Sequence, residues 1–453
     1  MHNTYVSVLT ILLLISVLTV FSVPVAAQSK TIIVPDDYSS ITSAIGNASN
    51  GDVILIRKGT YEEPINQTIV IDKSLSIIGE DPKNTNLILH PVYTETWILT
   101  SCITAYTDSI TVRANDFLLS NLTINSIRAG NISITGNRAR IFGNSIFTGS
   151  TANGLAINGD NCQVTDNTLF GTIFLTGSHN IISNNVCHVI FLNSANYNAI
   201  VINSLKFLSL GLNNQSLCSS NHIIGNRIDG YEGVLLGCAI GNIFSKNLFN
   251  CQIGYFVYQL GPEIGSSANL TPSENNSFYL NNFIGYLVGR TFALTSTKNF
   301  WDNGVEGNYY NDYNGSDVNQ DGIGDVPYII NDNNTDNYPL VAPCNIDDIS
   351  AEFEKLKNIG FNFQSAPIVA FPLMITATPS PPPSIVPIAV PTDSTLNPSS
   401  LPILQPTINI GPHTGPALIP TVLIVASIFT AVVIASILIY KRHRKTAISV
   451  KKR

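Results

Sequence analysis

One loop in the second half of the chain carries oxygen atoms at the spacing that a hard cation needs. It runs from residue 317 to residue 325, and Gly322 stands at position 6, where the turn must be tight. The positions that would supply oxygen, the fourth through its backbone carbonyl, are Asp317, Asn319, Asp321, Ile323 and Asp325. Tyr328 replaces the bidentate glutamate that closes a complete loop, so Asp312 or Asp332 would have to supply a further ligand. The loop predicts either a structural Ca²⁺ site or a turn rich in Asx hydrogen bonds.

Acid/base chemistry has one candidate set, in the middle of the chain. Asp116, Arg138 and Asp160 follow one another at intervals of 22 residues, and Arg140 and His179 lie near them in the sequence. A carboxylate, a guanidinium and an imidazole could exchange protons with a sugar substrate if they shared one groove. Asp160, Arg140 and His179 are therefore the candidate catalytic residues, and an exposed ladder of ion pairs is the alternative interpretation.

Composition argues against several other kinds of chemistry. Only seven acidic residues fall between positions 114 and 298, which is few for an enzyme that cleaves polysaccharides. The seven cysteines form no CxxC pair and have no histidine at metal-ligand spacing, so we expect most of them to be buried thiols. Seven of the 23 Lys and Arg residues fall in the last 13 positions. No basic face remains elsewhere for phosphates, and nucleic-acid binding is disfavoured.

A loose internal repeat must build the elements that position these residues. Its unit is an apolar residue, two small or polar residues, an asparagine, and an apolar residue two positions further on. The asparagines that mark the units are Asn144, Asn167, Asn185, Asn203, Asn226, Asn247 and Asn282. A period near 20 residues, with short apolar runs broken by Gly and Asn, is typical of a solenoid of stacked β-strand rungs.

The repeat predicts an all-β chain with a definite interior. Inward Ile, Leu, Val and Phe would stack from rung to rung, and Asn and Gly would adopt left-handed conformations at the corners. Stacked asparagines at equivalent corners could also bond to one another along the axis. The first edge of a solenoid needs a cover, and the segment from Asp36 to Ile45 fits a short capping helix.

The two ends of the chain carry targeting signals. Val6 to Val23 are apolar or small, and small residues precede Gln28, as at a signal-peptidase site. Residues 417–440 are uncharged and long enough to cross a membrane, and the basic residues after them resist translocation. The predicted organisation is a signal peptide (1–27), a β-helix (28–345), a short connecting segment (346–365), a Pro/Ser/Thr-rich stalk (366–416), a transmembrane helix (417–440) and a basic cytoplasmic tail (441–453). We therefore expect a single-pass protein of the cell membrane with an extracellular N-terminal ectodomain.

Two groups of motifs resemble known families. Val34 to Ile41, Gly51 to Leu55 and Gly59 to Tyr61 resemble the N-terminal signature of pectin-lyase-like β-helix proteins. The motifs that resemble the C-terminal signature of the NosD-type family are Asn299 to Asp302, Gly307 to Tyr313, Asp321 to Asp325, Pro327-Tyr328 and Tyr338 to Leu340. The resemblance implies a right-handed parallel β-helix with an N-terminal helical cap. It implies no single activity, since the fold hosts lyases, hydrolases, epimerases and non-catalytic binders.

The NosD-type family is named for a periplasmic accessory factor of a copper protein. Copper handling nevertheless finds little support in this chain. Copper sites favour His, Cys and Met, but the mature exterior has Met374 as its one methionine. The histidines there are scattered and are His90, His179, His188, His222 and His413.

The sequence favours a non-enzymatic cell-surface β-helix that binds glycans or adheres to neighbouring surfaces. The expected partners are polysaccharides or cell-envelope glycans and the membrane, and the one expected cofactor is Ca²⁺. The alternatives are a membrane-anchored polysaccharide lyase or hydrolase, working through the candidate residues named above, and a structural protein of the cell envelope. Nine Asn-X-Ser/Thr sequons also predict a glycoprotein.

Overall fold

A computed structural model describes ten stretches of the chain. They are residues 29–98, 101–127, 130–149, 154–211, 216–231, 233–251, 257–259, 273–285, 292–293 and 297–365. The predicted signal peptide, stalk, transmembrane helix and cytoplasmic tail lie outside the described residues. Within these stretches, no helix has both the length and the apolar character needed to cross a membrane.

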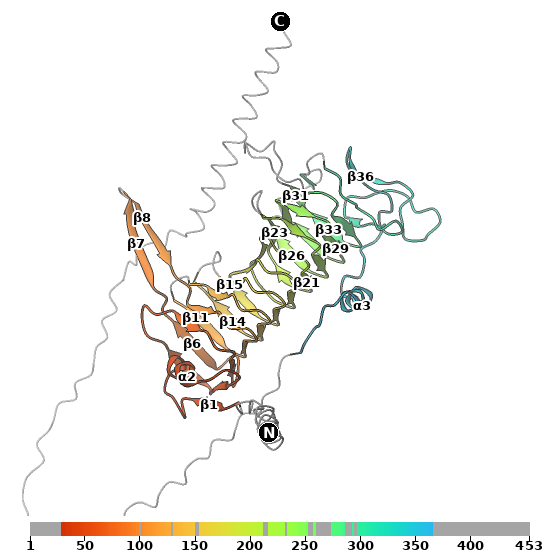
Figure 1. Cartoon of the computed structure of the whole chain (residues 1–453). Coiled ribbons are helices and arrows are strands. Elements are labelled where there is room, and N and C mark those ends of the chain that lie inside the picture. The colour runs from red at the N-terminus through yellow and green to blue at the C-terminus, as the bar shows by residue number, and fades with distance from the viewer. Residues whose placement is uncertain are drawn as a thin grey trace, which may run out of the picture. The chain divides into compact units, whose positions relative to one another are not determined.

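Parallel strands stack into a coil with three sides (Figure 1). The first sheet runs β1 (Thr31–Val34), β2 (Val53–Ile56), β5 (Ser76–Gly79), β10 (Leu118–Ser120), β13 (Arg140–Phe142), β16 (Gln163–Thr165), β19 (Ile181–Ser183), β21 (Ala199–Val201), β25 (His222–Ile224), β29 (Ile243–Ser245) and β32 (Ser277–Tyr279). The second runs β4 (Ile69–Ile71), β9 (Ile110–Val112), β12 (Ile132–Ile134), β15 (Gly154–Ile157), β18 (Thr172–Leu175), β20 (Val189–Leu192), β23 (Phe207–Leu210), β27 (Val234–Leu236), β31 (Val257–Gln259) and β34 (Phe292–Ala293).

The third side is built from two shorter sheets. One contains β3 (Gly59–Glu62), β6 (Thr85–Leu89), β11 (Thr123–Ser126), β14 (Ser145–Phe147) and β17 (Thr168–Phe170). The other contains β22 (Ser204–Leu205), β26 (Arg227–Gly230), β30 (Leu248–Cys251), β33 (Asn282–Gly285) and β35 (Tyr309–Tyr310). Val186 forms single bridges to Thr168 and to Ser204, and so continues the side between them. This pairing confirms the prediction of an all-β parallel β-helix.

Three two-stranded pairs complete the described strands. They are the parallel pair β24 (Cys218–Ser219) and β28 (Ala239–Ile240), and the antiparallel pairs β7 (Tyr93–Ile98) with β8 (Ser101–Tyr106) and β36 (Tyr328–Asn331) with β37 (Asn334–Asp336).

Inward side chains form continuous apolar columns. In the first sheet one column, in register from rung to rung, is Ile54, Ile77, Leu119, Ile141, Val164, Ile182, Ile200, Ile223, Phe244 and Phe278, all of them buried. Burying each such side chain stabilises the fold by about 1.5–3 kcal/mol. The cysteines expected to be buried include Cys162, Cys187, Cys218, Cys238 and Cys251, and the structure confirms this for all five.

Two ladders of buried asparagines run along the corners. In the first, each side-chain amide nitrogen donates to the next Oδ1 at 2.9–3.0 Å, through Asn144, Asn167, Asn185, Asn203, Asn226, Asn247, Asn281 and Asn308. The second, which we did not expect, contains Asn198, Asn221, Asn242, Asn276 and Asn299. The predicted bonding along the axis is confirmed, except that Asn281 takes the place assigned to Asn282.

Both ends of the coil are covered. The predicted N-terminal cap is α2 (Ile41–Asn47), which buries Ile41, Ala44 and Ile45 against the first rungs and is capped by the Ser40 side chain. At the other end, aromatic rings continue the apolar columns. Trp301 stacks on Phe278 with 4.5 Å between ring centroids. Its side chain is 1 % exposed, so the last rungs are closed to water.

The segment predicted as a connection over 346–365 packs against the coil. Residues 344–364, here called the strap, contain α3 (Ser350–Asn358) and run back along the first sheet toward the N-terminal rungs (Figure 1). Leu356 lies in an apolar cluster with Ile181 and Ile224 of that sheet. Arg227 also forms an ion pair with Asp347 at 2.6 Å. The strap is therefore a fourth layer over one outer face.

Candidate functional site

Eight residues in the left-handed backbone conformation line one edge of the first sheet. Each stands two positions before a strand, and their φ values fall between 54° and 64°. They are Asp116, Arg138, Asn161, His179, Tyr197, Ser220, Gly241 and Asn275, here called the turn row. Strand register places each member directly above the last. This conformation costs most residues roughly 1–2 kcal/mol, so large side chains here are a reason to look for a function.

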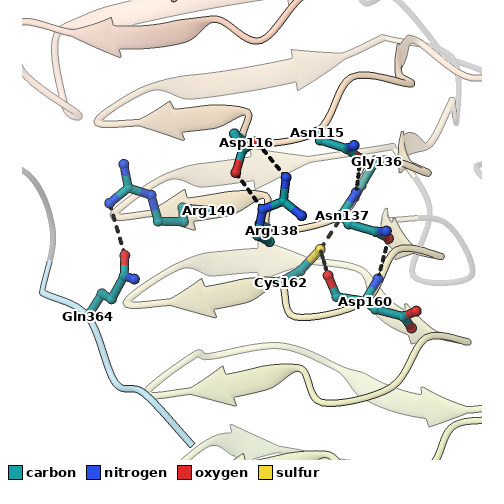
Figure 2. Close-up of polar contacts among 9 residues, drawn as sticks. All are labelled: Asn115, Asp116, Gly136, Asn137, Arg138, Arg140, Asp160, Cys162 and Gln364. Carbon is teal, nitrogen blue, oxygen red and sulfur yellow. Dashed lines mark hydrogen bonds and ion pairs between the residues drawn. The ribbon is translucent and has the colours of Figure 1, made fainter.

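The first two members of the turn row form a two-pronged ion pair (Figure 2). Arg138 Nε and Nη2 donate to the two carboxylate oxygens of Asp116, both at 2.7 Å. These bonds lower the pKa of Asp116 and raise the pKa of Arg138. Both side chains are more than half exposed, so the pair adds little stability. Its local effect is that both carboxylate oxygens of Asp116 accept hydrogen bonds from Arg138.

A cavity of about 430 Å³ lies between the turn row and the end of the strap. Its size is that of a small-molecule site. The coil side contributes Asp116, Arg138, Arg140, Gln163 and His179, among others. The strap side contributes Phe361, Asn362 and Gln364. Guanidinium, imidazole, amide and aromatic groups therefore face one space.

Hydrogen bonds fasten the strap beside this cavity. Gln163 Nε2 donates to the backbone oxygen of Gln364 at 2.8 Å, and the backbone nitrogen of Gln364 donates to Gln163 Oε1 at 3.2 Å. Arg140 Nη1 donates to Gln364 Oε1 at 3.1 Å (Figure 2). Within the described stretches no ion pair joins Arg140 to a carboxylate. Its charge is therefore available to an acidic group.

Two of the three candidate catalytic residues reach the cavity. Arg140 and His179 line it, and Asp160 is not among its lining residues. The rung that starts at Arg138 is one residue longer than the one before it, so Asn161 takes the place in the turn row that even spacing would give to Asp160.

Asp160 belongs to a neighbouring column, on the side of the turn away from Arg140 (Figure 2). In that column each side-chain oxygen accepts the backbone N–H of the next rung. Asn115 accepts from Asn137 at 2.8 Å, Asn137 from Asp160 at 2.8 Å, and Asp160 from Ser178 at 2.7 Å. The Asp160 carboxylate therefore helps to hold consecutive rungs together.

Sequence reasoning missed the residues that the strap brings to the site. Phe361 and Gln364 were placed in a connecting segment, and nothing in the spacing linked them to Gln163. The available signal was alternation, since one polar residue, Asn362, separates Phe361 from Phe363, as in a chain packed on one face. Phe363 indeed lies against the apolar cluster under α3.

The predicted Ca²⁺ loop folds as a tight turn. Asp317 accepts from the backbone nitrogens of Asp321, at 3.2 Å, and Gly322, at 3.0 Å. Asp325 Oδ2 accepts from Val318 N at 2.9 Å, and the φ of Gly322 is 88°. In the described part of the chain, no group of three His, Cys, Asp or Glu side chains gathers as a metal site would require. The turn geometry suits either interpretation, and the Ca²⁺ site stays a prediction.

Comparison with known proteins adds little to this geometry. No protein-family model matches the chain, and no curated protein matches it. Eleven solved chains are similar, among them a PL6 family alginate lyase, AlyGC, at 12 % identity and a TM-score of 0.37. The match covers 76 % of this chain and only 60 % of that enzyme. A score this low does not establish a shared fold, so the β-helix assignment rests on the strand pairing.

Proposed function

We propose that this protein is a cell-surface, right-handed parallel β-helix that binds acidic glycans in the cavity under the strap. The observation that supports this most is the set of side chains that line the cavity together with Arg140. Within the described residues Arg140 forms no ion pair, so its guanidinium suits a sugar carboxylate, and the side-chain amide of Gln364 suits a hydroxyl group. Phe361 adds an aromatic face to the same cavity, as in many small-molecule sites.

The state of the one carboxylate in the cavity favours binding over cleavage. General acid/base catalysis needs a group that can take or give a proton at the reacting bond. Asp116 is the only Asp or Glu among the described lining residues, and Arg138 donates to both of its oxygens. This arrangement stabilises the ionised carboxylate and leaves it poorly placed to act as an acid.

Cell-surface display is the second part of the proposal, and its support comes from the sequence. Residues 1–27 have the pattern of a signal peptide, and residues 366–416 and 417–440 have the patterns of a stalk and a membrane span. Alkaline extraction of membranes would leave a single-pass protein in the pellet, and protease added to intact cells would remove the ectodomain. Recovery of the protein in the alkaline supernatant would contradict the anchor.

Binding is tested with the full-length protein in detergent on an array of acidic and neutral glycans. We expect retention of polyuronates, and about tenfold weaker retention by the Arg140→Gln variant, because a charged hydrogen bond is lost. Arg113→Gln is the matched control, since Arg113 is exposed and pairs with Asp72 at 3.6 Å outside the cavity. Equal retention by wild type and Arg140→Gln, or retention of no acidic glycan, would overturn the proposal.

Cleavage of the same glycans is the second candidate function, favoured by Arg140 and His179 lining one cavity. A lyase or hydrolase would release shorter oligosaccharides from polyuronates during incubation, and His179→Ala would abolish that release. Unchanged chain lengths after prolonged incubation with wild-type protein would exclude this function for those glycans.

A further inference from the structure

The turn row continues beyond the cavity. His179 lines the cavity, and the next members along the coil axis are Tyr197, Ser220 and Gly241. Successive rungs lie about 4.8 Å apart, so Tyr197 stands about 14 Å from Arg138 along the axis. The row therefore extends the site in the direction of the coil axis.

Tyr197 presents an open aromatic ring at this position. It stacks on His179 with ring centroids 5.5 Å apart and planes only 11° from parallel. Its side chain is nevertheless 54 % exposed. Within the described residues its hydroxyl makes no hydrogen bond. One ring face therefore rests on the cavity wall, and much of the remainder meets water.

The two members after Tyr197 leave space above its other face. Ser220 has a side chain too short to cover a ring on the neighbouring rung, and Gly241 has none. A Cβ built on Gly241 would meet no atom within 4 Å, so the space there is open. Together they form a ledge about two rungs long beside the tyrosine ring.

The turn itself does not require a tyrosine here. The turn requires a left-handed residue, which Asn and Gly supply at least cost, and both occur elsewhere in the row as Asn161, Gly241 and Asn275. A tyrosine adds conformational strain, and its exposure shows that burial does little to offset it. The exposed part of the ring is therefore available to a ligand.

We propose that an acidic glycan chain leaves the cavity parallel to the coil axis and stacks one sugar ring on Tyr197, over the ledge of Ser220 and Gly241. The C–H groups on a pyranose face suit the electron-rich face of an aromatic ring. This inference rests on the proposed function and adds that the affinity of the site depends on the length of the glycan chain. Tyr197 is a second subsite, and Arg140 holds the acid group in the first.

The test measures affinity for oligogalacturonates and oligomannuronates of two to eight residues, with full-length protein in detergent. Tyr197→Ala should weaken binding of the longer oligomers about tenfold and leave the dimers unchanged. Tyr197→Phe should bind as wild type does, because the ring remains. Ser220→Tyr should repeat the loss by filling the ledge. Tyr231→Ala, which removes a 69 % exposed tyrosine that is not a member of the turn row, is the control.

The possible outcomes separate the two proposals. In one outcome, Tyr197→Ala leaves the affinity for long and short oligomers unchanged while Arg140→Gln weakens both. That result would leave the proposed function standing and overturn the second subsite. Equal losses for dimers and octamers in Tyr197→Ala would also overturn it, since the ring would then act within the cavity. Failure of wild-type protein to bind any oligomer would overturn the proposed function and the subsite together.

Discussion

Gln163 and Gln364 lie 201 residues apart in the chain and hold each other through two hydrogen bonds. The Gln163 side chain uses its amide as donor and acceptor toward the backbone of Gln364, as a neighbouring strand would. The Gln364 side chain is then free to accept from Arg140. One glutamine pair thus fixes the end of the strap and sets one wall of the cavity.

Replacing Gln163 with alanine should release the end of the strap. Each lost hydrogen bond is worth about 1 kcal/mol, so residues 359–364 should open more often, and the rungs should keep their stability. Hydrogen exchange would show faster amide exchange in that segment only, with weaker glycan retention. Gln67→Ala, at an exposed position away from the cavity, is the control. Unchanged exchange in residues 359–364 would show that the pair does not hold the strap.

Removing one member of the first asparagine ladder should destabilise the whole coil. The buried Asn203 side chain donates to Ile182 O and Asn226 Oδ1 and accepts twice from Asn185. Alanine would leave several of these buried groups unsatisfied, at a cost of about 3 kcal/mol or more in the free energy of unfolding.

Urea unfolding of Asn203→Ala measures this loss. Asn193→Ala is the matched control, since the Asn193 side chain makes no hydrogen bond within the described residues and should cost under about 1 kcal/mol. Similar losses in the two variants would contradict the role assigned to the ladder.

Asp336 should make stability depend on pH. Burial raises its pKa from 3.8 to about 6, although it accepts from Asn308 N and Tyr310 Oη at the end of the first ladder. The folded state therefore keeps this proton between pH 4 and 6, where the unfolded chain has lost it. The contribution of Asp336 to the free energy of unfolding is greatest below about pH 4 and falls as the pH rises from 4 through 6. The total change is at most about 3 kcal/mol.

The Asp336→Asn variant isolates this contribution, because Asn cannot titrate and its oxygen can still accept from Asn308. Exposed carboxylates affect both proteins equally. The stability of wild type relative to Asp336→Asn should therefore fall from pH 4 to pH 7 and then stay constant. A difference that is flat across this range would show that Asp336 is ionised throughout.

Calcium should stabilise the fold if the loop of residues 317–325 binds it. At 100 times the dissociation constant a ligand of the native state adds about 2.7 kcal/mol, which appears as a higher melting temperature. Excess chelator should reverse the shift, and Asp317→Asn should abolish it. Asp72→Asn, an exposed carboxylate outside the loop, should leave it intact. If the melting temperature does not change when Ca²⁺ is added, the Asx-rich turn is the correct interpretation.

Counting residues located the first ladder only approximately and missed the second. The unit around Asn282 was assigned one position late, because two asparagines are adjacent there and the apolar pattern fits either. The actual member, Asn281, bonds to Asn308, and the Asn282 side chain bonds to Cys344 of the strap. Equal spacing likewise pointed to Asp160 where the structure has Asn161, since the rung after Arg138 is one residue longer than the rung before it and no local signal marks the change.

The sequence alone determined the rungs, the inward apolar columns, the ladder of asparagines and the N-terminal cap, because each depends on neighbours within one or two turns of the coil. Those patterns repeat and can be read by period. Only the tertiary structure decided that the strap folds back on the first sheet and that Gln364 meets Gln163 and Arg140. These contacts join parts of the chain that no period relates, and each depends on the exact length of every rung between them.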